Sequence, residues 1–274
     1  MSEKNKYILI FGANGMLGRY MASYFDLIPE FKVIRIMRNQ VDAQYVTNEK
    51  LKAFLDNYKN AYVINCIGKI PQRGNDDIRS YIQINSIFPY ILSNCCTITQ
   101  NKLIHITTDC VYTGKKGGYT EIDEHDEKNI YGLSKSLGEP NDVCIIRTSI
   151  IGEEIENKKS LLEWVKNNQN KHIDGFVNHY WNGVTCLQLC KIVHKMIIDN
   201  IFWKGVRHIY SPNTLSKYDM VKCISNIYQL NILINPKETI KIDKSLSSIN
   251  DIIFEIPSIE NQIIQLKEFS SNLV

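Results

Sequence analysis

The stretch that decides the fold is KYILIFGANGMLG, residues 6–18 of a chain of 274 residues. Lys6–Phe11 is a continuous apolar run, which predicts a buried strand, and the apolar period from Met16 to about Leu27 predicts a helix. A strand, a glycine turn and a helix expose backbone N–H groups at the helix N-terminus, where they attract a pyrophosphate. A tight structural turn is the alternative. The candidate cofactor-binding residues here are Gly12, Asn14, Gly15, Met16, Leu17 and Gly18.

Strand and helix patterns alternate through the rest of the first half. Strands are expected at Phe31–Ile36, Ala61–Cys66, Leu103–Thr107 and Val143–Thr148, with helices at Asn48–Tyr58 and Asp76–Thr97. This alternation predicts an α/β fold with a Rossmann-type, doubly wound parallel sheet. We expect residues 1–150 to form an NADP-binding Rossmann domain to which 180–212 partly return. Residues 151–179 and 213–274 are expected to form a smaller, interleaved C-terminal substrate-binding part.

The pattern loosens after Gly152, but five further elements can be recognised. They are helices at Leu161–Asn168, Thr185–Ile198, Ser216–Tyr228 and Ile259–Phe269, and a sixth strand at Val206–Tyr210. Ser258 follows Pro257 and is the expected N-cap of the last helix.

The end of the second expected strand indicates which dinucleotide is bound. An NAD site typically has an Asp or Glu there that binds the ribose 2′-hydroxyl, but this chain has Arg35 and Arg38 and no acid until Asp42. A guanidinium suits a 2′-phosphate as a bidentate partner, which favours NADP(H) over NAD(H). A solvated arginine is the alternative. Further candidate cofactor contacts follow the third strand or lie in the long helix: Cys66, Ile67, Gly68 and Asn85.

A second stretch carries the candidate chemistry: ITTDCVYTGKKGGYTEIDEHDEKNIYGLSKSLGE, residues 106–139. A short helix over Asn129–Leu137 would place Tyr131 and Lys135 on one face, about one turn apart. An ammonium held near a phenol lowers the tyrosine pKa from its usual value of about 10, so that the tyrosine can exchange a proton with a substrate oxygen. Thr108 would bring a hydroxyl to the same site. The alternative is a surface helix with an ordinary tyrosine.

Composition excludes several classes of protein. The net charge is +3 with dispersed basic residues, which does not suggest a nucleic-acid partner. No apolar run approaches the roughly 18–20 residues of a membrane span, and the N-terminus does not read as a signal peptide, so we expect a cytoplasmic protein. The eight cysteines show no paired CxxC spacing, which predicts reduced thiols and no metal site. The oligomeric state is open, with a homodimer as one option.

The segments GANGMLG, TTDCVYTGKKGGYTEIDEHDEKNIYGLSKSLGE and IIRTSIIGEE together resemble the extended short-chain dehydrogenase/reductases, and among them most of all the dTDP-4-dehydrorhamnose reductase group. The resemblance covers about residues 6–152. It implies that Thr108 binds the substrate carbonyl oxygen, Tyr131 is the acid, and Lys135 holds the nicotinamide ribose and tunes Tyr131. It also implies that the glycines flank the pyrophosphate, that Arg38 contacts the 2′-phosphate, and that the substrate is a nucleotide sugar. The candidate substrate-binding residues are Lys69, Thr108, Asp109, Cys110, Asn178, His179 and Trp181.

Departures from the family pattern concern the sugar. Cys110 stands where the rhamnose enzymes usually have Tyr, and Ile67-Gly68-Lys69 replaces an Ala-rich stretch. The leading interpretation is an NADPH-dependent reductase of a 4-keto-6-deoxy nucleotide sugar, with a UDP-linked 2-acetamido-2,6-dideoxyhexose as one substrate class. An epimerase or 4,6-dehydratase is the first alternative, but dehydratases need an Asp-Glu pair where this chain has Asp109-Cys110. A non-catalytic NADP-binding regulatory subunit is the second alternative.

Overall fold

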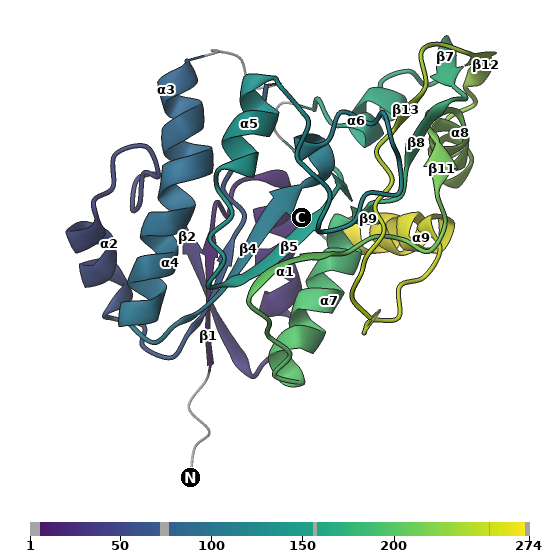
Figure 1. Ribbon diagram of the computed structural model, residues 1–274. Coiled ribbons are helices and arrows are strands. Elements are labelled where there is room, and N and C mark those ends of the chain that lie inside the picture. Colours follow the sequence, from purple (N-terminus) through teal and green to yellow (C-terminus); the bar gives the residue numbers. More distant parts are fainter. Residues whose placement is uncertain (1–5, 72–76, 156–157, 252, 272–274) are drawn as a thin grey trace. The chain divides into compact units, whose positions relative to one another are not determined.

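The computed structural model (Figure 1) describes residues 6–71, 77–155, 158–251 and 253–271. The chain divides into two compact units. The first comprises Met1–Thr107, Lys128–Arg147 and Cys190–Val206, and the second comprises Thr108–Glu127, Thr148–Leu189 and Arg207–Val274. Because residues 108–127 belong to the second unit, the division does not coincide with the boundary at residue 150 expected from the sequence.

The first unit is built on a six-stranded sheet in the order β2-β1-β3-β4-β5-β10. Its strands are β1 Lys6–Phe11, β2 Phe31–Ile36, β3 Tyr62–Asn65, β4 Lys102–Thr108, β5 Cys144–Thr148 and β10 Gly205–His208. β1 pairs in parallel with both β2 and β3, and β3 pairs in parallel with β4. The chain passes from β1 to β2 on one side and then crosses to β3 on the other. The expected Rossmann-type α/β fold is confirmed, and its topological switch point lies between β1 and β3.

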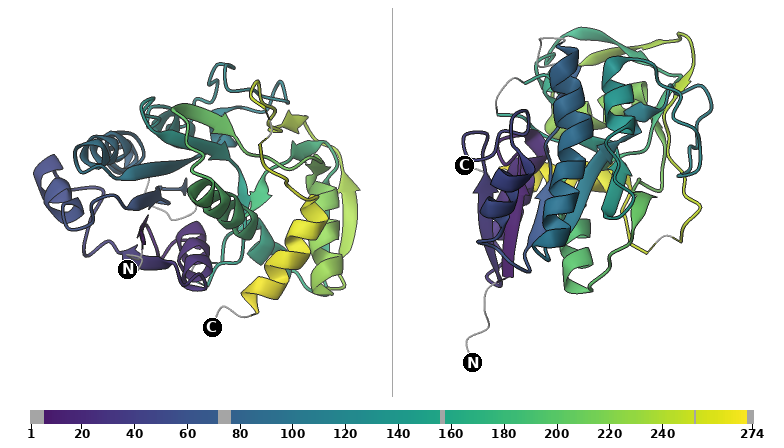
Figure 2. Two further views of the ribbon diagram at one scale, coloured as in Figure 1. Left: turned by 90° about the horizontal axis from the view of Figure 1, so that it is seen from below. Right: turned by 60° about the vertical axis from the view of Figure 1, so that its left-hand side comes forward.

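Helices cover both faces of this sheet (Figure 2). Alternate strand residues such as Leu9, Phe11 and Val63 are buried in one cluster with α2 Asn48–Leu55 and α4 Phe88–Ile98. On the other face lie α1 Met16–Asp26 and α7 Cys186–Ile198, joined by the Tyr24 hydroxyl 3.2 Å from Nδ1 of His194. Apolar residues therefore point both ways from the sheet, which is why its strands read as continuous apolar runs.

The long helix expected at Asp76–Thr97 is interrupted. It consists of α3 Ile78–Tyr81, a π-helical turn η2 Ile82–Ile87, and α4; Asp76 lies outside the described residues. Pro89 explains the interruption, because it has no N–H to donate to the carbonyl of Asn85 four residues earlier. The Asn85 carbonyl is directed instead at Gly138, where a Cβ would lie 1.8 Å from its oxygen.

In its described residues, the second unit holds small sheets and three complete α-helices. A three-stranded sheet has the order β11-β8-β13, with bounds Leu215–Ser216, His179–Trp181 and Ile242–Asp243. Two-stranded sheets join β12 Leu233–Lys237 to β7 His172–Phe176 and β6 Ile150–Ile151 to β9 Val184–Thr185. The helices are α6 Leu161–Lys166, α8 Lys217–Tyr228 and α9 Ile259–Ser270. Each begins at a serine cap, and the expected cap Ser258 accepts a hydrogen bond from the Asn261 N–H.

Candidate active site

The glycine turn lies at the switch point of the sheet. Gly12 follows β1 with φ +78°, and a Cβ on it would come within 3.0 Å of Cγ1 of Ile67. A Cβ on Gly18 would lie 2.1 Å from the carbonyl oxygen of Gly12, so α1 can approach β1 this closely only with glycine. Gly15 caps α1 without any side chain. The turn therefore presents backbone at a helix N-terminus, which fits the pyrophosphate of a dinucleotide.

The turn after β3 is held by two fully buried polar residues that the sequence analysis missed. Oδ1 of Asn65 accepts a hydrogen bond from the Ile67 N–H at 3.0 Å, and its Nδ2 lies 3.0 Å from Nδ1 of His105 in β4. Burial, assisted by the nearby charge of Lys135, holds the pKa of His105 well below its usual value. The imidazole is therefore neutral, so Nδ1 accepts from Asn65 and Nε2 carries the proton.

The helix with the candidate acid is α5 Ile130–Ser136, capped by Asn129, whose Oδ1 accepts from the Gly132 N–H at 2.8 Å. Tyr131 and Lys135 are separated by about one turn, as predicted. Lys135 is 5% exposed, and its Nζ donates to the carbonyl oxygen of Ile106 at 3.4 Å. Burial lowers the pKa of Lys135 to about 8, although Glu139 acts in the opposite direction.

Asn85 connects the turn after β3 to α5. Its Oδ1 accepts from the Lys69 N–H at 2.8 Å, and its Nδ2 donates to the Lys69 carbonyl and to Oγ of Ser134, each at 3.0 Å. A Cβ on Gly68 would lie 3.8 Å from Asn85 Oδ1 and 4.0 Å from Lys135 Nζ. Three predicted residues, Gly68, Asn85 and Lys135, thus come together in the first unit.

The two arginines considered for the 2′-phosphate differ in their contacts. Arg35 forms an ion pair with Asp26 in α1. Nε of Arg38 contacts Oδ2 of Asp42 at 2.9 Å, while the side chain remains 74% exposed. The Asp42 contact uses Nε only, so the outer edge of the Arg38 guanidinium remains at the surface.

Thr108 ends β4 and begins the second unit. Its hydroxyl accepts from the Cys110 N–H at 3.1 Å and donates to Oδ1 of Asp109 at 3.2 Å, and this caps the 3₁₀ turn η3 Asp109–Val111. Burial raises the pKa of Asp109, against the opposing charges of Lys244 and Lys217. The Thr108 hydroxyl is thereby oriented by its neighbours in the second unit. Its placement against Tyr131 stays a prediction.

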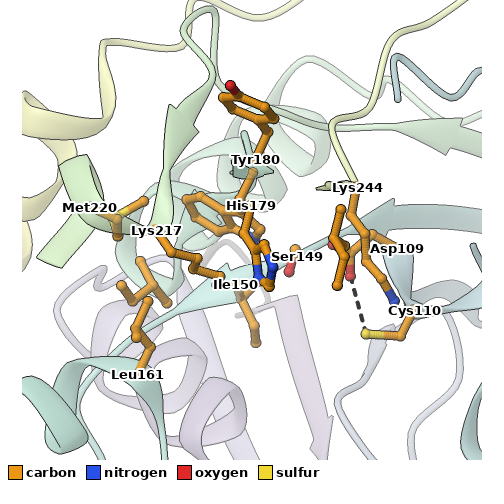
Figure 3. Close-up of a pocket in the computed structure, with 13 residues that line it drawn as sticks. Asp109, Cys110, Ser149, Ile150, Leu161, His179, Tyr180, Lys217, Met220 and Lys244 are labelled. Carbon is orange, nitrogen blue, oxygen red and sulfur yellow. Dashed lines mark hydrogen bonds between the residues drawn. The ribbon is translucent and has the colours of Figure 1, made fainter. Parts of the chain in front are cut away.

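The second unit encloses a pocket of about 260 Å³ (Figure 3). The predicted substrate residues Asp109, Cys110, His179 and Trp181 line it. Asn178 is not among the lining residues, because its side chain is hydrogen-bonded to the Thr239 backbone. Lys69 belongs to the first unit, where its ammonium lies 5.0 Å from the centre of the Tyr81 ring. The lining residues that the sequence did not suggest are Ser149, Ile150, Ile151, Leu161, Lys217, Met220, Ile242 and Lys244.

Within residues 6–71, 77–155, 158–251 and 253–271, no group of three His, Cys, Asp or Glu side chains is arranged to hold a metal ion. Over the same ranges, every helix is too short or too polar to cross a membrane.

Comparison with known proteins places these features in a family. The family profile described as the RmlD substrate binding domain matches residues 6–246. The dTDP-4-dehydrorhamnose reductase of Aggregatibacter actinomycetemcomitans is 26% identical over 231 residues, which cover 79% of this chain and 77% of that protein. Methionine adenosyltransferase 2 subunit beta of Danio rerio is 20% identical over 247 residues, or 81% of this chain and 74% of that one.

Among solved structures, the dTDP-4-dehydrorhamnose reductase of Bacillus anthracis in complex with NADP superposes with a TM-score of 0.81. The match covers 97% of this chain and 99% of the other at 20% identity. At this identity the likeness establishes the fold, which agrees with the sheet order described above.

Proposed function

Because the chain belongs to the RmlD substrate binding domain family, we propose that it is an NADPH-dependent reductase of a 4-keto-6-deoxy nucleotide sugar. The observation that carries this proposal is the first-unit cluster in which buried Lys135, one turn after Tyr131, lies beside Gly68 at the switch point of the sheet. Dinucleotides bind at such points in doubly wound sheets. The product would serve deoxysugar biosynthesis.

The residues of the first unit fit a dinucleotide. The glycine turn would take the pyrophosphate on the backbone N–H groups at the N-terminus of α1, which Gly18 allows to approach β1 closely. Lys135 would hold the nicotinamide ribose, and Arg38 would pair with the 2′-phosphate. When bound, NADPH supplies the hydride for reduction.

The chain's own residues supply the proton. Tyr131 would donate its phenolic proton to the substrate oxygen at C4 as that oxygen becomes an alkoxide. Lys135 has a pKa of about 8, so it is mostly cationic at neutral pH and stabilises the resulting phenolate. Thr108 would turn its hydroxyl from Asp109 Oδ1 to the same substrate oxygen and orient it.

The pocket of the second unit is the proposed place of the sugar. Trp181 is 8% exposed and lines the pocket together with Tyr180. Aromatic faces suit the apolar faces of a pyranose ring. The side chains of Ile150 and Met220 form an apolar part of the pocket wall. Ser149 provides a hydroxyl that can form a hydrogen bond with a sugar substituent.

The proposal is tested by following NADPH oxidation with a panel of 4-keto-6-deoxy sugars linked to dTDP, UDP or GDP, with and without a 2-acetamido group. We expect turnover with at least one member and its loss in Tyr131→Phe. NADPH binding without turnover on the whole panel would reject the reductase and support the regulatory-subunit alternative. Turnover of a 4-hydroxy sugar without net NADPH oxidation would instead support an epimerase.

A further inference from the structure

Lys217 is a partly buried cation for which the described residues provide no close ion pair or hydrogen bond. It is the first residue of α8 and lines the second unit's pocket. Within the described part of the chain, no carboxylate lies within 4.0 Å of its Nζ, and no hydrogen bond to its side chain is found. Burial lowers the pKa of Lys217. Holding an unpaired ammonium out of water is unfavourable, so an anionic ligand at this position would remove a cost that the ligand-free protein bears.

Lys244 reaches the same pocket from the opposite edge of the three-stranded sheet. β8 is the central strand of that sheet, and it pairs with β11 through Ser216 and with β13 through Asp243, both opposite Tyr180. Lys217 directly follows Ser216 and Lys244 directly follows Asp243, so the register places one lysine on each side of β8. The backbone N–H of Lys244 also donates to the Tyr180 carbonyl at 3.2 Å. Figure 3 shows the two side chains entering the pocket from opposite sides.

The charges of the pocket do not balance. Asp109 is the only carboxylate among the lining residues of this pocket, and burial raises its pKa. The lining therefore carries two lysines and one carboxylate. Glu127, outside the lining, approaches Lys244 Nζ at 3.9 Å, which is too long for a strong hydrogen bond. A surplus of positive charge in a partly enclosed space selects an anion.

We infer that Lys217 and Lys244 bind the diphosphate of a nucleoside diphosphate-linked substrate, one lysine from each side of β8. This inference rests on the proposed function and identifies the part of the pocket that recognises the nucleotide portion. Lysines recognise phosphate as point charges, which does not require one fixed orientation. The volume of about 260 Å³ lies just below the roughly 300–1,000 Å³ of pockets that enclose a whole ligand, so it suits a sugar and its phosphates better than a complete nucleotide sugar.

The test is calorimetric titration of UDP, dTDP and GDP into the full chain, with the corresponding nucleosides as reference ligands. In Lys217→Met and Lys244→Met, we expect the affinity for the preferred nucleoside diphosphate to fall about tenfold to a hundredfold. Nucleoside affinity should not change, because nucleosides lack the anion. Lys217→Arg retains the charge and should recover most of the affinity, which guards against a folding defect in the methionine variant.

Lys222→Met is the matched control, since Lys222 belongs to the same helix and does not line the pocket. Wild-type affinity in Lys217→Met, an equal loss in Lys222→Met, or no binding of any of the three diphosphates to the wild type would each overturn the inference. The titration contains neither NADPH nor a keto sugar. If the lysine variants lose affinity for the diphosphate but the wild type does not oxidise NADPH with any keto sugar, only the proposed reductase is rejected. If the wild type oxidises NADPH but the lysine variants bind the diphosphate normally, only the diphosphate site is rejected.

Discussion

The ammonium nitrogen of Lys135 lies 3.4 Å from the carbonyl oxygen of Ile106. A long hydrogen bond to a neutral carbonyl does not replace the hydration that the ammonium loses on burial, so burial dominates and the pKa falls to about 8. Glu139, whose charge raises the pKa of Lys135, is itself paired with Arg147 at 2.5 Å. Lys135 is thus a buried charge that lowers the stability of the folded protein. Such destabilising groups are common at functional sites.

Lys135→Met should stabilise the ligand-free protein. The folded-state pKa of Lys135 is about 8 and the ordinary value is 10.5, so the unfolded chain binds more protons between these values and stability rises with pH across that window. Below pH 8 the full penalty is present, at most about 3 kcal/mol from about 1.36 kcal/mol per pKa unit. We expect a higher urea midpoint for Lys135→Met at pH 7, with the difference from wild type shrinking between pH 8 and 10.5.

The exposed Lys50 provides the control, since Lys50→Met removes a similar charge from the surface of α2. It should leave the unfolding free energy within about 0.5 kcal/mol of wild type at every pH. Equal urea midpoints for Lys135→Met and wild type at pH 7 would show that Lys135 is not strained in the folded protein.

His105 should make the protein sensitive to acid. Its pKa is held well below 6.5, so below pH 6.5 the unfolded chain binds a proton that the folded chain does not, and stability falls as pH decreases. The slope from this group is at most about 1.36 kcal/mol per pH unit. Urea unfolding of His105→Phe should show a flatter dependence between pH 6.5 and 5. A slope identical to wild type would mean that other groups cause the acid sensitivity.

The same variant also separates the two roles of the imidazole. His105→Phe leaves the buried Nδ2 of Asn65 without its acceptor, which should cost about 1–3 kcal/mol at pH 7.5. His105→Asn offers an oxygen near the position of Nδ1 and should recover part of that loss while remaining insensitive to acid. If both variants were equally destabilised, the Asn65 contact would not be the reason.

Local signals explain what could be predicted from the sequence. The strand Lys6–Phe11, the glycine turn and the spacing of Tyr131 and Lys135 are encoded in consecutive residues, and these features agree with the structure. The π turn could be predicted only by noting that Pro89 cannot donate a hydrogen bond to the carbonyl of Asn85. Pro89 stands well inside the helix expected at Asp76–Thr97, where a proline breaks the hydrogen-bond ladder, so the sequence did carry a signal for this interruption.

Residues that meet through long-range pairing could not be predicted. Lys217 and Lys244 come to one pocket because β11 and β13 pair with opposite edges of β8. The paired segments of β11 and β13 are only two residues each, too short to show a strand period. By contrast, His179 and Trp181 could be predicted, because both belong to one short aromatic segment that forms a single strand.

Arg38 should determine the choice of NADPH over NADH. Arg38→Ala should raise the Michaelis constant for NADPH about tenfold to a hundredfold and leave that for NADH nearly unchanged, because only NADPH carries the 2′-phosphate. Asp42→Asn is the informative companion, since it removes the charge that competes for Arg38 while an amide oxygen can still accept from the Gln44 N–H. It should keep or strengthen the NADPH preference. Equal use of both cofactors by the wild type would refute the assignment.

Tyr131→Phe tests the proton transfer itself. The substitution removes one oxygen and keeps the ring, so folding and NADPH binding should survive while kcat falls by about 10²–10⁴-fold, the usual contribution of general acid catalysis. Thr108→Val removes one hydrogen bond to the substrate oxygen and should cost less. Single-turnover NADPH oxidation measures both, and binding of NADPH by calorimetry confirms that the cofactor site is intact.

The decisive comparison is with the Tyr131→Phe/Lys135→Met double variant. Lys135 acts on catalysis largely through the phenol of Tyr131, so once that phenol is gone, removal of the ammonium should lower kcat much less than it does in the wild type. The remaining effect should appear in the Michaelis constant for NADPH, because the ribose contact does not depend on Tyr131. Strictly additive losses in kcat would mean that the two residues work independently. Near-wild-type turnover in Tyr131→Phe would remove Tyr131 as the acid and leave a cofactor-binding protein without this chemistry.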